Sequence, residues 1–139
     1  LVSNAMKYTP RGGNVTITVE ELPCEKEGYM KIKSEIKDTG IGMSKEYLPT
    51  LFEPFSREQN TTTGRVVGTG LGMPIVKKMV DLMGGSLEVE SEPGKGTVFT
   101  FTLMHKIADR KYYSQRIEKV KTSKKLGLLS SVWKMEFSA

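Results

Sequence analysis

Two neighbouring segments in which apolar residues recur at alternate positions constrain the fold of this chain most strongly. Residues 14–22 and 29–38 both alternate, and a stretch with proline and glycine, residues 23–28, separates them. The alternating residues are Val15, Ile17 and Val19 in the first segment and Met30, Ile32 and Ile36 in the second. A period of two is typical of a half-buried β-strand, and two such strands around a short turn form a hairpin. We therefore expect a β-hairpin early in the chain.

The other regular patterns predict helices and a second hairpin. Residues 1–8 carry a helical pattern, and residues 44–51 favour a short helix capped by its first serine. Residues 74–83 form one apolar helical stripe that begins with proline and ends before two glycines. Two further strands, 87–92 and 97–104, flank a Pro-Gly-Lys-Gly turn. This order predicts an α+β fold, a two-layer sandwich with a mixed, mostly antiparallel sheet and helices on one face.

The charge of the chain is divided unevenly along its length. The 139 residues carry a net charge of +5. Residues 1–104 contain 12 Lys/Arg and 13 Asp/Glu, a balance of −1, whereas residues 105–139 contain 9 and 3, a balance of +6. A near-neutral domain with a basic tail is not the pattern of a nucleic-acid-binding domain. We expect one domain over residues 1–104 and a basic tail over 105–139, whose role and place in the fold the pattern leaves open.

The composition excludes several other classes of protein. One cysteine and one histidine cannot form an internal disulfide or a zinc cluster. No apolar run is long enough to span a bilayer, and residues 1–10 lack the pattern of a signal peptide. Because disulfides mark oxidising compartments, we expect a cytoplasmic domain that does not enter the membrane, although a membrane-bound protein could carry it.

A glycine-rich segment, Gly-Thr-Gly-Leu-Gly at residues 68–72, directly precedes the helical stripe. Glycines let the backbone approach a phosphate closely, and the N-terminus of the following helix offers free N–H groups. The spacing matches neither the Walker pattern nor a dinucleotide fingerprint. A flexible linker is the other interpretation of this segment taken alone.

A second candidate segment, Asp-Thr-Gly-Ile-Gly at residues 38–42, follows the second predicted strand. The carboxylate of Asp38 could accept a hydrogen bond from an exocyclic amine, and the glycines leave room for a flat ring. An ordinary aspartate turn is an equally good interpretation of this segment by itself.

Three residues of the opening helix form the third candidate group. Asn4, Lys7 and Tyr8 are spaced three and four apart, so they share one helix face. An amide oxygen for Mg²⁺, an ammonium for phosphate and a ring for a base would suit bound Mg²⁺–ATP. An amphipathic helix without a ligand is the alternative.

Taken in order, these motifs resemble the ATP-binding (HATPase) domain of bacterial sensor histidine kinases, within the GHKL ATPase superfamily. Residues 4–10 resemble the second half of the N-box, 38–43 the G1 box, 52–55 the F-box, 68–73 the G2 box and 94–97 the last glycine turn. The Lys-Tyr-Thr-Pro and Phe-Glu-Pro-Phe sequences favour histidine kinases over the gyrase, chaperone and mismatch-repair branches.

The resemblance implies roles for the residues around the base and the metal. Asn4 would bind Mg²⁺, Lys7 would contact phosphate, and Tyr8 would lie against the adenine. Asp38 would accept from the adenine amino group, and Thr97 would support that hydrogen bond directly or through water. The glycines that would shape this pocket are Gly40 and Gly42.

The resemblance also implies a lid with a phosphate-binding backbone. Phe52 and Phe55 would anchor the lid, and Arg57 would reach the γ-phosphate, a role that Arg65 could take instead. The residues that would bring backbone groups to the phosphates are Gly68, Thr69, Gly70, Leu71 and Gly72.

The function implied is that of the catalytic part of a histidine kinase, with ATP and Mg²⁺ as ligands. It would pass the γ-phosphoryl group to a histidine on a separate helical hairpin, with Lys7 and Arg57 as catalytic residues. A response regulator receiver domain would be the next partner. We expect His105 to be a surface or structural residue, so the chain should not phosphorylate itself alone.

Two departures from the pattern of this family leave other functions open. The strand before the N-box and the first N-box residue have no counterpart in this sequence. The alternative is therefore a degenerate or truncated nucleotide-binding or interaction module without phosphotransfer. A serine kinase of the anti-sigma type on the same fold is disfavoured by residues 52–55. We expect a monomer, although an open sheet edge would permit an extended or swapped assembly.

Overall fold

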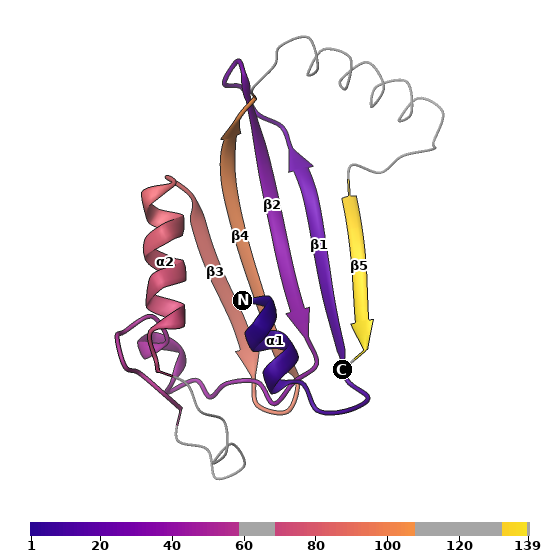
Figure 1. The fold of residues 1–139 in the computed structure, drawn as a ribbon, viewed down its shortest axis with the longest axis vertical. Helices are drawn as coiled ribbons and strands as arrows, with labels where there is room; N and C mark the ends of the chain where they lie inside the picture. Colours follow the sequence, from indigo (N-terminus) through magenta and orange to yellow (C-terminus); the bar gives the residue numbers. More distant parts are fainter. Residues whose placement is uncertain (59–68, 108–131, 139) are drawn as a thin grey trace.

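The computed structural model describes residues 1–58, 69–107 and 132–138. Its elements are α1 (Val2–Tyr8), β1 (Asn14–Leu22), β2 (Tyr29–Asp38), the 3₁₀ turn η1 (Leu48–Thr50), α2 (Gly72–Leu82), β3 (Ser86–Glu92), β4 (Gly96–Lys106) and β5 (Val132–Ser138). Figure 1 shows the strands side by side in one sheet, with α1 in front of it. Both hairpins expected from the sequence are present, as β1–β2 and β3–β4.

The sheet has the strand order β3-β4-β2-β1-β5, and every neighbouring pair is antiparallel. The central pair, β2 and β4, joins the two hairpins and aligns Asp38 with Thr97. This register brings residues that are 59 positions apart into direct contact. The ends of β2 and β4 thus create one corner of the sheet at which the candidate motifs converge.

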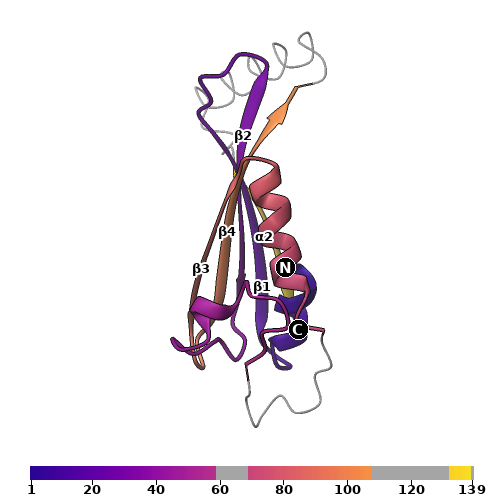
Figure 2. The same ribbon diagram turned by 90° about the vertical axis from the view of Figure 1, so that its left-hand side faces the viewer.

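Both helices cover the same face of the sheet, which confirms the predicted α+β sandwich (Figures 1 and 2). Ala5 of α1 packs on Val15 and Ile36, and Met73 of α2 packs in a cluster with Phe99. Ile36 and Phe99 are cross-strand partners, so their side chains lie on one face. The alternation read from the sequence therefore selects the buried face of each strand.

The predicted length of the short helix over residues 44–51 is wrong. Only Leu48–Thr50 is regular, as a 3₁₀ turn, although Ser44 does accept a hydrogen bond from the backbone N–H of Tyr47 at 3.2 Å. Pro49 explains the difference, because proline lacks the N–H that an α-helix beginning after Ser44 would need at that position. The following segment consequently turns back toward the start of α2.

Part of the tail that the sequence left unplaced joins the sheet. Residues 132–138 form β5 and pair antiparallel with β1, with Phe137 aligned to Val15. At the other end of the tail, β4 continues past the expected boundary at residue 104 as far as Lys106. Across the described ranges, no helix has the length and apolar character needed to cross a membrane.

Candidate functional site

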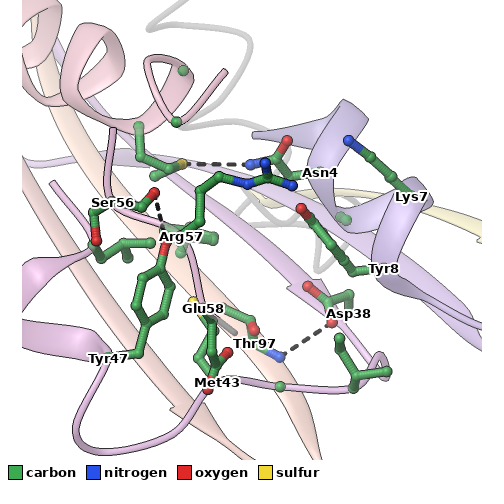
Figure 3. Close-up of a pocket in the computed structure, with 18 of the residues that line it drawn as sticks. Asn4, Lys7, Tyr8, Asp38, Met43, Tyr47, Ser56, Arg57, Glu58 and Thr97 are labelled. Atoms are coloured by element: carbon green, nitrogen blue, oxygen red, sulfur yellow. Dashed lines mark hydrogen bonds between the residues drawn. The ribbon is translucent and has the colours of Figure 1, made fainter. Parts of the chain in front are cut away.

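A cavity of about 280 Å³ lies where α1, the loop after β2, the segment after η1 and the start of α2 meet the first residues of β4. The residues that line it are Asn4, Ala5, Lys7, Tyr8, Asp38, Ile41, Gly42, Met43, Tyr47, Leu51, Ser56, Arg57, Glu58, Thr69, Gly70, Gly72, Met73, Thr97 and Phe99. Figure 3 shows ten of them labelled, from segments far apart in the sequence. Most of the residues proposed from the sequence therefore share one pocket.

Asp38 forms the most buried polar group of this pocket. Its side chain is 5% exposed, and its Oδ1 accepts hydrogen bonds from the backbone N–H groups of Gly40 at 2.9 Å and Thr97 at 3.2 Å. Both bonds end on the same oxygen, so Oδ2 is left for the cavity that the residue lines. Burial raises the pKa of Asp38, while the two N–H donors act in the opposite direction. The pocket thus presents a buried carboxylate acceptor.

Glycines let two loops close tightly around this carboxylate. Gly42 has φ = +68°, and a Cβ there would collide with the carbonyl oxygen of Glu92. Gly96 has φ = +96°, and a Cβ there would collide with the carbonyl oxygen of Asp38. Side chains rarely adopt such backbone angles, so glycine is required at both positions by angle and by space. Gly42 lines the cavity, as expected from the sequence.

Hydrogen bonds of Ser91 on β3 connect the loop after β2 with the start of β4. Its Oγ donates to the carbonyl of Gly96 at 2.9 Å and accepts from the backbone N–H of Met43 at 2.8 Å. It also lies 2.9 Å from the hydroxyl of Thr97. Because the single proton of Ser91 goes to Gly96, Thr97 must be the donor in that contact. The Thr97 oxygen therefore keeps acceptor capacity on the side of the cavity.

The three residues proposed on α1 all line the cavity. The Asn4 amide nitrogen lies 3.6 Å from the sulfur of Met73, a weak contact across to α2. Lys7 Nζ lies 5.6 Å from the centre of the Tyr8 ring. In the view of Figure 3, Asn4, Lys7 and Arg57 gather on one side, and Asp38 and Thr97 lie together on another. The cavity therefore offers cations and a carboxylate at separate places.

The aromatic pair of residues 52–55 lies beside the cavity and does not line it. Phe52 packs against the core cluster of Leu51, Met73 and Phe99. Phe55 is 73% exposed with φ = +64°, and its N–H donates to the carbonyl of Gly70 at 3.0 Å. Phe55 thus fixes the segment after η1 to the glycine-rich segment through its backbone.

The segment after η1 supplies charged groups to the cavity. Arg57 and Glu58 both line it, and Glu58 Oε1 accepts a hydrogen bond from the backbone N–H of Ser44 at 2.8 Å. Of the glycine-rich segment, Thr69, Gly70 and Gly72 line the cavity. The other proposed residues stand as follows: Leu71 precedes α2, Gly40 lies outside the lining, and Arg65 and Gly68 fall outside the described residues.

Sequence reasoning missed Tyr47, Ser56 and Glu58, which line the cavity. The hydroxyl of Tyr47 donates to the carbonyl of Ser56 at 3.4 Å, and burial raises the pKa of Tyr47. The hydroxyl consequently remains a proton donor at neutral pH. No sequence signal pointed to these three residues, because the turn that brings them to the cavity is a tertiary feature.

Comparisons with known proteins identify the family of this chain. Residues 1–107 match the model of the family described as "Histidine kinase-, DNA gyrase B-, and HSP90-like ATPase". The chain is 43% identical over 110 residues to the autoinducer 2 sensor kinase/phosphatase LuxQ of Vibrio parahaemolyticus, covering 79% of this chain and 13% of that protein. It is 41% identical over 106 residues to the sensor histidine kinase WalK of Bacillus subtilis, covering 76% and 17%. The chain thus spans less than a fifth of the length of these relatives.

Solved structures show the same fold. The mycobacterial sensor histidine kinase MprB superimposes with a TM-score of 0.56 at 27% identity, covering 76% of this chain and 68% of that chain. The catalytic domain of the histidine kinase ThkA gives a TM-score of 0.55 at 29% identity, covering 73% and 59%. The motifs, the fold and the sequence match converge: the chain resembles domains of sensor histidine kinases, and it belongs to the histidine kinase-, DNA gyrase B- and HSP90-like ATPase family.

Proposed function

We propose that this domain binds ATP with Mg²⁺ and supplies the γ-phosphoryl group to a histidine on a separate helical hairpin of its parent kinase. The observation that carries the proposal is the buried Asp38 carboxylate, which directs one oxygen into a cavity that Lys7 and Arg57 also line. The carboxylate suits the exocyclic amine of adenine, and the two cations suit phosphates. A base and a polyphosphate would therefore occupy different parts of one pocket.

Asn4 fits the role of metal ligand. Its amide lines the cavity, and the contact to Met73 uses the nitrogen, so the oxygen remains available to a cation. Mg²⁺ typically takes one or two protein oxygens and completes its shell with phosphates and water. Bound Mg²⁺ would supply charge neutralisation at the phosphates. Within the described residues no group of three His, Cys, Asp or Glu could hold a metal ion by itself, which agrees with a site shared with the nucleotide.

The transfer would depend on position and charge rather than on covalent chemistry with this domain. Lys7 and Arg57 would offset the negative charge that spreads over the phosphoryl oxygens as the bond to ADP breaks. Gly70 and Gly72 line the cavity at the start of α2, where backbone N–H groups face a ligand. The phosphoryl group would then bond to a ring nitrogen of the acceptor histidine, and ADP would leave.

The acceptor histidine would belong to a different domain. His105 is exposed and lies eight residues beyond Thr97 on β4. At about 3.3 Å per residue, this places it roughly 26 Å along the strand from the Asp38 corner. A response regulator receiver domain would take the phosphoryl group from the acceptor, and the whole pathway would operate in the cytoplasm.

The test is calorimetric titration of the chain with ADP and with a non-hydrolysable ATP analogue, each with and without Mg²⁺. We expect binding that strengthens with Mg²⁺ and weakens in Lys7→Ala, whereas Lys95→Ala, which changes a lysine outside the cavity, is the matched control. Adding the helical hairpin of a histidine kinase and labelled ATP tests phosphotransfer. Binding without transfer would support the alternative of a nucleotide-binding interaction module, and no binding by the folded chain would refute the proposal.

A further inference from the structure

Among the residues that the structure describes, no strand pairs with the outer side of β5. Within the described part of the protein, β5 is the last strand of the sheet and pairs with β1 alone (Figure 1). Its outer N–H and C=O groups over residues 133–138 therefore form a row that a further strand could pair with. Natural edge strands usually carry bulges, prolines or charges, lysine above all, against such pairing. The strand β5 contains no proline, its register with β1 is continuous, and its two charged residues, Lys134 and Glu136, have opposite signs.

An exposed apolar stripe follows one face of β5. Trp133, Met135 and Phe137 are 66%, 53% and 41% exposed. Their register with β1 places them on the helix-bearing face, because Phe137 is aligned with the fully buried Val15. Three large apolar side chains thus continue the core face of the sheet to its edge and remain in contact with water.

Opposite charges occupy the other face of the same strand. Lys134 and Glu136 form an ion pair at 2.5 Å, and their side chains are 59% and 63% exposed. Their partners on β1 are Thr18 and Thr16, which carry no charge. The ion pair is therefore not needed to hold β5 on β1, and exposed pairs of this kind contribute little by themselves.

We propose that β5 is a self-association surface, at which a second copy of this chain pairs its own β5 antiparallel about a two-fold axis at Met135. The sequence of the strand is complementary to itself in this register. Trp133 lies opposite Phe137 of the second copy, Lys134 lies opposite its Glu136, and Met135 lies opposite its Met135. Two copies thereby form one continuous sheet with the helices of both on the same face.

The charges select this register over its neighbours. Moving the axis to Lys134 places lysine opposite lysine, and moving it to Glu136 places glutamate opposite glutamate, which is destabilising. A slip of one residue puts the two apolar stripes on opposite faces of the sheet. The other edge strand, β3, carries Glu88, Glu90 and Glu92 on one face, so two copies of β3 repel each other. The β5 edge is therefore the one suited to self-pairing.

A charge-exchange experiment on the full chain tests the proposal by sedimentation equilibrium over a range of concentrations. Lys134→Glu places glutamates opposite each other in the dimer, and Glu136→Lys places lysines opposite each other. Each change reverses two cross-strand pairs, so each weakens dimerisation at least about tenfold. The double variant Lys134→Glu/Glu136→Lys restores complementarity, and an equimolar mixture of the two single variants forms a heterodimer.

Glu90→Lys on β3 is the matched control, because it makes the same charge change on the other edge strand and leaves the dimer unchanged. Circular dichroism of each variant checks that the fold is retained. A wild-type chain that is monomeric at every concentration overturns the proposal. So does a dimer that survives both single reversals, or one that the double variant and the mixture fail to restore. ADP affinity is measured in parallel. Because β5 does not line the cavity, a loss of ADP binding would count against the proposed function and not against the dimer.

Discussion

Replacing Asp38 by asparagine separates the two roles that the structure gives this carboxylate. In the free protein, Oδ1 accepts from the backbone N–H groups of Gly40 and Thr97. An asparagine must keep its oxygen at that position to preserve both bonds. Its Nδ2 group then points into the cavity where Oδ2 of the aspartate was available. The variant therefore presents a donor where the adenine amine also presents a donor.

The magnitude follows from the hydrogen bonds that change. A hydrogen bond to a charged group contributes about 1.5–3 kcal/mol, and an unpaired buried donor costs about 1–3 kcal/mol. We take a loss of about 3 kcal/mol, which lowers ADP affinity by a factor of roughly 100 to 200. Stability of the free protein should not fall at neutral pH. Since the raised pKa shows that burial disfavours the ionised form of Asp38, the neutral amide removes that cost.

The assay is titration calorimetry with ADP and IDP, together with thermal unfolding of the free chain. IDP carries an oxo group in place of the 6-amino group, so the Asp38→Asn variant should bind IDP better relative to ADP than the wild type does. Asp81→Asn, the same change at an exposed position on α2, is the control and should bind like the wild type. An Asp38→Asn variant that binds ADP within about threefold of the wild type would refute the assignment of Asp38 as the base reader.

Three further predictions concern the same corner of the sheet. Gly42→Ala should lower the free energy of unfolding by about 1–3 kcal/mol in thermal denaturation. Gly28→Ala has a similar positive φ but open space around it, so it should cost less, and equal costs would contradict the packing argument. Ser91→Ala frees the Thr97 hydroxyl and should weaken ADP binding about tenfold, while Ser86→Ala should have no effect; calorimetry distinguishes them. ADP affinity should fall as the pH is lowered from neutral through the raised pKa of Asp38, because the acceptor becomes protonated. The same group contributes stability to the free fold that is fully present below its unfolded pKa and is lost as the pH rises through the folded pKa. An affinity that does not change with pH would rule out an ionised acceptor.

Much of the fold was predictable because its signals are local. Alternation in residues 14–22 and 29–38 identifies each buried face without knowledge of any other segment. Asn4, Lys7 and Tyr8 share a helix face through spacing alone, and all three line the cavity. The aspartate and glycine motifs likewise depend on short stretches of chain, which is why their resemblance to a family was detectable.

The helix expected after Ser44 was predicted too long for a local reason. The other features that the sequence did not predict depend on contacts between distant segments. Pro49 outweighs the capping serine within one turn. No sequence pattern indicates that Ser91 accepts the hydroxyl proton of Thr97, because this depends on the close approach of two loops around Gly96.

The sequence by itself determined which faces of the strands and of α1 are apolar or polar and which residues could bind a nucleotide. Only the tertiary structure decided that Asp38 and Thr97 meet, since the register of β2 against β4 is a property of the whole sheet. It also decided that residues 132–138 form the outer strand. A seven-residue apolar alternation can pair with any open edge, and the free edge of β1 exists only after the sheet has formed.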